Sequence, residues 1–144
     1  MENETINTIQ NQIIDDFSVF DQWLDKYEYL IEMGKNLPPF PETEKNEQNL
    51  IQGCQSRVWL STRFHDGMIE FLADSDAIIT KGIIGLLIRV LNHRTPQEIL
   101  DTELYFIDKI GLSQNLSPTR ANGLVSMIKQ MKRYALVYQQ ISKK

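Results

Sequence analysis

Residues 58–73 read VWLSTRFHDGMIEFLA, and this stretch decides the fold. Apolar and polar side chains alternate from Val58 to Phe64, which predicts a strand with one buried side. The pair Asp66-Gly67 predicts a two-residue turn, because both residues tolerate the positive φ angles that such a turn requires. Residues 68–73 alternate again and predict the returning strand. We therefore expect an antiparallel hairpin, with His65 as a solvated residue at its tip.

The most apolar segment of the chain follows the hairpin. Apolar residues occupy nearly all sides of residues 77–92, which predicts a buried central helix. Gly82 and Gly85 lower helix stability, so we expect them to allow close packing against another backbone. The preceding Asp74-Ser75-Asp76 predicts side-chain capping of the first turn.

Helical patterns lie on both sides of this centre. Residues 1–34 carry apolar stripes at intervals of three and four and predict two helices. We expect Asp21 to cap the second helix and Gly34 to end it in the left-handed conformation. Thr95-Pro96-Gln97-Glu98 predicts a capping box with proline at the first helical position. Ser117-Pro118 predicts the start of the last helix.

A long connection joins the first helices to the hairpin. Residues 37–41 read LPPFP and exclude a helix interior. A loop as long as residues 35–57 is usually functional or disordered in a compact domain. Residues 49–52 give weak support for a third strand. The order of helices, hairpin and helices predicts one α+β domain over residues 1–144, a small antiparallel sheet with helices packed against it.

Composition excludes several classes of protein. A hydrophobic fraction of 42% is typical of a globular protein, and a net charge of −4 without a basic block argues against nucleic acid as a partner. Met1–Thr5 is acidic and polar and lacks the pattern of a signal peptide. The apolar segment 77–91 contains Lys81 and Arg89 and is too short to span a bilayer. We therefore expect a cytoplasmic protein without a membrane partner.

Cys54 is the only cysteine in the chain. It has no partner for an internal disulfide, and the two histidines, His65 and His93, are too few to complete a metal site with it. His93 stands between two predicted helices and is interpreted as a linker residue rather than a base. The thiol is therefore either a packed side chain or a nucleophile.

The neighbours of Cys54 favour the nucleophile. A free cysteine more often behaves as a small buried apolar residue. Here Gly53 removes a side chain beside the sulfur and permits unusual backbone angles. Gln52, Gln55 and Ser56 are polar and are poor core material. We expect the thiol to lie on a loop.

Three segments of the chain resemble the SufE family of sulfur-acceptor proteins. They are IQGCQS at 51–56 with Val58-Trp59, DSDA at 74–77 with Lys81-Gly82, and LSPTR at 116–120 with Gly123-Leu124. Their order and spacing match the family, and the similarity covers nearly the whole chain. Arg57 departs from the pattern, because relatives commonly have Gln there.

The resemblance implies a fold shared with iron–sulfur scaffold proteins of the IscU type. It also implies partnership with a SufS-type cysteine desulfurase, whose pyridoxal phosphate is its own, so that this chain needs no cofactor. Cys54 would take persulfide sulfur from the desulfurase, stimulate it and pass the sulfur to a downstream Suf cluster scaffold. A CsdE-type protein, which serves a different desulfurase, would look the same at these motifs.

The resemblance also assigns residues around the thiol. It implies a role in forming the cysteine loop or in binding the partner for Gln52, Gly53, Gln55, Ser56, Asp76 and Arg120. For two of them an ordinary structural role is an equal alternative: a helix cap for Asp76 and a surface salt bridge for Arg120.

This chemistry fits the residues. A thiolate attacking a persulfide is sulfur exchange, which needs no activated carbonyl and no Cys-His-Asn arrangement. With no second thiol in the chain, a persulfide on Cys54 cannot collapse into an internal disulfide. One cysteine is also too few for an iron–sulfur scaffold. We expect a sulfurtransferase accessory protein rather than a stand-alone enzyme. An activator that docks without carrying sulfur is the alternative, and monomer and homodimer both remain open.

Overall fold

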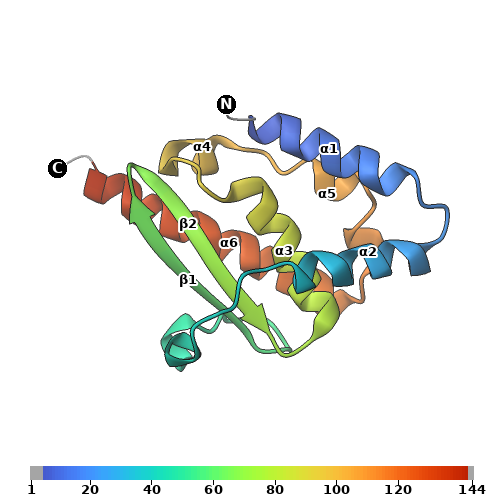
Figure 1. Ribbon diagram of the computed structural model, residues 1–144, viewed down its shortest axis with the longest axis horizontal. Helices are drawn as coiled ribbons and strands as arrows, with labels where there is room; N and C mark the ends of the chain where they lie inside the picture. The colour runs from blue at the N-terminus through green and yellow to red at the C-terminus, as the bar shows by residue number, and fades with distance from the viewer. Residues whose placement is uncertain (1–4, 143–144) are drawn as a thin grey trace.

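The predicted hairpin is present in the computed structural model, which describes residues 5–142 (Figure 1). Strand β1 (Val58–His65) pairs with β2 (Met68–Ser75) in an antiparallel register that aligns Val58 with Ser75. Asp66 and Gly67 take φ angles of 55° and 76°, as the two-residue turn requires. The predicted inner side is buried at Val58, Leu60, Ile69, Phe71 and Ala73. The alternation in β1 is incomplete, because Ser61 of the opposite side is buried too and Phe64 is only half-buried.

Helix α3 (Ile78–Leu91) is the buried centre of the fold and contacts α1, α2, α6 and β2. A Cβ atom added at Gly82 would overlap the carbonyl oxygen of Leu30 in α2 (Trp23–Lys35). A Cβ at Gly85 would lie 3.0 Å from the carbonyl oxygen of Met33, also in α2. The two glycines therefore bring α2 and α3 to backbone distance, which confirms the prediction of close packing.

The two N-terminal helices form as predicted, but their ends differ from the prediction. Helix α1 covers Ile6–Ser18. Asp21 does not cap α2, because Gln22 is the N-cap and makes no side-chain hydrogen bond there. Gly34 does not end α2 either: the C-cap is Asn36, in the right-handed conformation. A Cβ at Gly34 would lie 2.9 Å from the Gly82 nitrogen, so this glycine too serves the contact between α2 and α3.

The long connection runs along the hairpin and contains two short 3-10 helices, η1 (Glu42–Glu44) and η2 (Glu47–Asn49). Ion pairs join it to both strands, from Glu44 to Arg63 of β1 and from Lys45 to Asp74 of β2. The third strand is reduced to a single bridge between Leu50 and Trp59. The connection is therefore attached to the sheet immediately before the cysteine segment.

The C-terminal part contains α4 (Pro96–Asp101), the one-turn α5 (Phe106–Lys109), the 3-10 turn η3 (Ser113–Asn115) and the long α6 (Pro118–Ser142). The capping box between Thr95 and Glu98 is confirmed, with both hydrogen bonds formed. Helix α6 packs on the hairpin, where the ring of Tyr138 stacks on Phe64 with centroids 4.6 Å apart. Figure 1 shows α3 in the middle, with α1 and α2 on one side and the hairpin and α6 on the other.

The arrangement is the predicted α+β fold, a two-stranded antiparallel sheet with helices packed around it. The prediction for residues 1–4, which belong to the first helical segment, falls outside the described residues. None of the helices within residues 5–142 combines the length and the apolar character that a membrane span requires.

Candidate functional site

Cys54 lies in a short loop, residues 52–57, between the long connection and β1. The base of this loop is closed by a hydrogen bond from the Ile51 amide to the Val58 carbonyl, 2.9 Å long. Gly53 takes a φ angle of 92°, which side-chain-bearing residues rarely adopt. The prediction that glycine permits an unusual backbone beside the sulfur is therefore confirmed, and the thiol is on a loop as expected.

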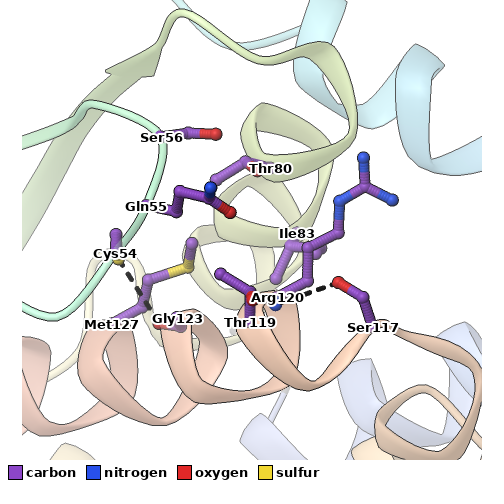
Figure 2. Close-up of a pocket in the computed structure, with 10 residues that line it drawn as sticks. All are labelled: Cys54, Gln55, Ser56, Thr80, Ile83, Ser117, Thr119, Arg120, Gly123 and Met127. Carbon is purple, nitrogen blue, oxygen red and sulfur yellow. Dashed lines mark hydrogen bonds between the residues drawn. The ribbon is translucent and has the colours of Figure 1, made fainter.

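The thiol points towards α6 and is only partly exposed (Figure 2). Its S–H donates a weak hydrogen bond to the Gly123 carbonyl oxygen, with sulfur and oxygen 3.7 Å apart. Burial raises the pKa of Cys54 above its ordinary value of 9.0. In this conformation the side chain is a protonated thiol at neutral pH and not a thiolate, which is the nucleophilic form of cysteine.

Two close contacts hold the loop against α6. A Cβ at Gly53 would overlap the hydroxyl oxygen of Ser126, which shows how near the loop backbone lies to the helix. A Cβ at Gly123 would lie 3.5 Å from the Cys54 sulfur, an ordinary contact distance. The absent side chain at Gly53 thus sets how closely the loop can approach, and the sulfur lies directly above the helix backbone.

A cavity of about 310 Å³ opens beside the sulfur, between the cysteine loop, α3 and the start of α6. We call it the thiol cavity. Its wall includes the buried Thr80 and Ile83 of α3, and Met127 of α6. Neither a histidine nor a carboxylate is among the residues that line it. The cavity therefore has room for atoms attached to the sulfur but offers no general base to activate it.

The loop is anchored at Arg57 by the junction between β2 and α3. The Arg57 amide donates to the Asp76 carboxylate over 3.1 Å, and the Asp76 amide donates back to the Arg57 carbonyl over 3.2 Å. The Ser75 hydroxyl donates to the same carbonyl over 2.8 Å. Asp76 therefore holds the cysteine loop. Its alternative role as a helix cap is wrong, because the N-cap of α3 is Ala77 and no side chain caps the helix there.

A second carboxylate, Asp74, joins three segments around the loop. It forms ion pairs with Lys45 of the long connection, 3.0 Å away, and with Lys81 of α3, 3.2 Å away. Burial alone would raise the pKa of Asp74, but hydrogen bonds from Lys45, the Ser75 amide and Lys81 outweigh it and lower the pKa. Asp74 is thus an ion-pairing group rather than a cap, and Lys81 is its partner on α3.

The predicted site residues are distributed over two surfaces. Gln55 and Ser56 line the thiol cavity together with Cys54. Gln52 lines a different groove on the reverse side of the loop. Arg120 lines the thiol cavity, and in Figure 2 its guanidinium lies at the opposite end from the sulfur. Within residues 5–142 Arg120 has no ion pair, so the alternative prediction, that Arg120 forms a surface salt bridge, is wrong.

Several cavity residues escaped the sequence prediction. Ile83 and Met127 carry no local signal, since each belongs to an apolar helical stripe that is typical of a core, and Thr80 is a single polar residue within such a helix. Gly123 could have been identified from the sequence, because a glycine in the interior of a helix lowers helix stability and therefore indicates a close contact with another group. The two histidines are absent from the cavity wall: His65 ends β1, and His93 takes a φ angle of 57° in the link after α3. Within residues 5–142 no group of side chains is placed to hold a metal ion.

Comparison with known proteins gives a family. The model of the SufE family, described as an Fe-S metabolism associated domain, matches residues 11–135. A SufE-like protein of Rhizobium meliloti (strain 1021) is 42% identical over 133 residues, which cover 89% of this chain and 95% of the relative. A SufE-like protein of Rhizobium etli is 39% identical over 132 residues, covering 88% and 89%.

A solved structure supports the fold. The solution structure of a hypothetical protein from Thermus thermophilus superimposes with a TM-score of 0.75, covering 92% of this chain and 96% of that one. The two sequences are 20% identical, so this likeness concerns the fold alone.

Proposed function

The chain belongs to the SufE family, and from that premise we propose that Cys54 accepts sulfur from a cysteine desulfurase. The family match supports a role in iron–sulfur metabolism. The observation that carries the finer proposal is the position of the thiol. It lies on a loop that is held from both ends, beside a cavity whose lining has neither a histidine nor a carboxylate.

The chemistry is an exchange of one sulfur atom. The Cys54 thiolate attacks the outer sulfur of a persulfide on the desulfurase cysteine. A new S–S bond forms on Cys54 and the S–S bond of the donor breaks. The donor cysteine leaves as a thiolate, and the transferred sulfur keeps its proton. No net oxidation occurs, and no base is needed once Cys54 is ionised.

Ionisation requires a change at the loop. Cys54 is held as a thiol by burial and by its contact with Gly123. Movement of the loop away from α6 would return the sulfur to water and restore an ordinary pKa. We expect docking of the desulfurase to favour this movement. If iodoacetamide alkylates Cys54 at the rate of a free thiol both with and without the desulfurase, the inward-facing thiol has no protective role.

Partners and cofactor follow from the same proposal. The donor is a SufS-type desulfurase and the recipient a downstream Suf cluster scaffold. Pyridoxal phosphate belongs to the desulfurase. We propose a cytoplasmic setting, where a reduced lone cysteine persists.

A docking activator that carries no sulfur is the second candidate. The protonated, partly buried thiol favours it, since the structure by itself shows no activated nucleophile. The two functions separate in Cys54→Ser. If desulfurase turnover is no longer stimulated by this variant, sulfur carriage accounts for the stimulation. Full stimulation by Cys54→Ser would instead identify docking as the activity.

Sulfur carriage itself is tested by intact mass. The protein is incubated with a SufS-type desulfurase and cysteine and is then measured without reductant. We expect a gain of one or more sulfur atoms on the wild type and none on Cys54→Ser. The absence of a gain with both the SufS-type and the alternative desulfurase, each shown to be active, would refute carriage.

A further inference from the structure

The reverse side of the cysteine loop forms one wall of a second groove, which we call the outer groove. Its volume is about 340 Å³, and it lies between the 47–52 segment and α6. Gln52 of the cysteine loop is part of the wall. Ser126, the residue against which Gly53 packs, is part of the opposite wall. The groove and the thiol cavity are thus both lined by the cysteine loop and by α6, the groove by Gln52 and the cavity by Cys54, Gln55 and Ser56.

Two cations line the outer groove without an ion pair. Lys129 and Arg133 are exposed and stand four residues apart on α6. Arg133 donates a hydrogen bond of 3.4 Å to Gln130, and in the described part of the chain neither cation pairs with a carboxylate. Glu47 is the carboxylate on the facing wall, so the lining carries two positive charges against one negative. The groove is positive on a chain whose net charge is −4.

Stability does not explain this pair. Like charges four residues apart on a helix cost about 0.2–0.5 kcal/mol, and nothing within residues 5–142 offsets the cost by ion pairing. By contrast, four other Lys and Arg residues in the described part of the chain form ion pairs with carboxylates of other segments, namely Lys45, Arg63, Lys81 and Arg89. Lys129 and Arg133 are therefore available to pair with an anionic group of another molecule.

We propose that the outer groove binds a short acidic segment of the desulfurase. This inference rests on the proposed function, because only a protein that approaches Cys54 would meet both sides of its loop. Two positive charges are too few for a nucleic acid, whose binding relies on many phosphate contacts. The amides of Gln48, Gln52 and Gln130 offer hydrogen bonds to a peptide backbone. A segment seated there would touch the contact between Gly53 and Ser126 that holds the loop on α6.

The test is the affinity for the SufS-type desulfurase holoenzyme, measured by titration calorimetry. We expect Lys129→Glu with Arg133→Glu to weaken binding roughly tenfold at low salt, since two attractions become repulsions. Lys129→Gln with Arg133→Gln removes the charges without repulsion and is expected to weaken binding about threefold. Lys129→Arg with Arg133→Lys keeps both charges and is expected to bind like the wild type.

The chain offers a matched control. Lys26 and Lys109 line another groove, of about 100 Å³, and have no ion pair within residues 5–142. Lys26→Glu with Lys109→Glu changes the net charge by the same amount and is expected to leave the affinity within about twofold of the wild type. Thermal melting followed by circular dichroism confirms that each variant is folded.

The possible results separate this inference from the proposed function. If both charge variants at Lys129 and Arg133 bind as tightly as the wild type, or if the control weakens binding equally, the outer groove is not the docking site. In that case sulfur can still appear on wild-type Cys54, and the proposed function stands. If the wild type neither binds the desulfurase nor gains sulfur, both proposals fall. Under saturating conditions we expect the charge-reversed protein to reach the same sulfur content as the wild type.

Discussion

Substitution of Gly53 perturbs the cysteine loop at its closest contact with α6. The φ angle of this residue is 92°, and a Cβ would overlap the Ser126 hydroxyl oxygen. A residue with a side chain held at such an angle costs about 1–3 kcal/mol, before any overlap is counted. We expect Gly53→Ala to move the loop off α6. The alkylation rate of Cys54 by iodoacetamide should then rise roughly 5- to 30-fold, the ratio that corresponds to about 1–2 kcal/mol.

Two controls divide this effect into its parts. Gly67, in the hairpin turn, has a φ angle of 76°, but a Cβ there would have no neighbour within 4 Å. Gly67→Ala should therefore lower the melting temperature and leave the alkylation rate unchanged. Ser126→Ala in the Gly53→Ala background removes the overlapping hydroxyl and leaves a contact of 3.4 Å with the Ser126 Cβ. This double variant should recover part of the wild-type rate. A wild-type alkylation rate in Gly53→Ala would refute the view that this contact holds the thiol inward.

Three further predictions concern pH, the core and the anchor of the loop. The pKa of Cys54 is higher in the folded state than its ordinary value of 9.0. The protonated thiol therefore contributes its full stabilisation at pH values below 9.0, and this stabilisation is lost as the pH rises through the pKa of the folded state. Urea denaturation of Cys54→Ala should show a weaker alkaline loss of stability, and equal losses would contradict the assignment. Gly82→Ala should destabilise the protein by about 3 kcal/mol in the same assay, because the added Cβ would overlap the Leu30 carbonyl oxygen. A loss below about 1 kcal/mol would mean that α2 and α3 separate easily. Asp76→Ala should lower the free energy of unfolding by about 1 kcal/mol and speed alkylation of Cys54, because the Arg57 amide loses its acceptor. Asp76→Asn keeps an acceptor oxygen and should change both quantities less. Identical behaviour of the two variants would show that the hydrogen bond is unimportant.

The elements predicted correctly are those whose signal is local. The Asp66-Gly67 turn dictates the hairpin from two residues with positive φ angles. The capping box between Thr95 and Glu98 satisfies its own backbone groups within one turn. The apolar composition of α3 fixes its central place, since a helix without a polar side must be surrounded.

The wrong predictions concern residues whose local sequence fits two different structural roles. Gly34 stands near a helix end and reads as a left-handed cap, yet its small size serves the packing of α2 on α3. Asp76 precedes a helix and reads as a cap, but the group it binds is the amide of Arg57, nineteen positions earlier. Which partner a short polar residue finds depends on the tertiary fold, and the sequence around it does not record that choice.

The candidate site is predictable in the same uneven way. The motif around Cys54 locates the nucleophile and its glycine, because both are needed within one loop. The opposite wall includes Ile83 and Met127, which helical periodicity assigns to the core. The separation of Gln52 from Gln55, onto opposite sides of the loop, depends on the backbone turn at Gly53, and no local pattern predicts it.

The central claim is that Cys54 takes sulfur directly from the desulfurase. The most direct measurement uses a desulfurase that has been loaded with persulfide and freed of cysteine. This desulfurase is mixed with the protein, and the intact masses of both are followed over time. The account predicts that the desulfurase loses its extra sulfur at the rate at which this chain gains one sulfur atom, and that peptide mapping places it on Cys54. Release of the sulfur as sulfide, with no gain on Cys54 at any time, would contradict it.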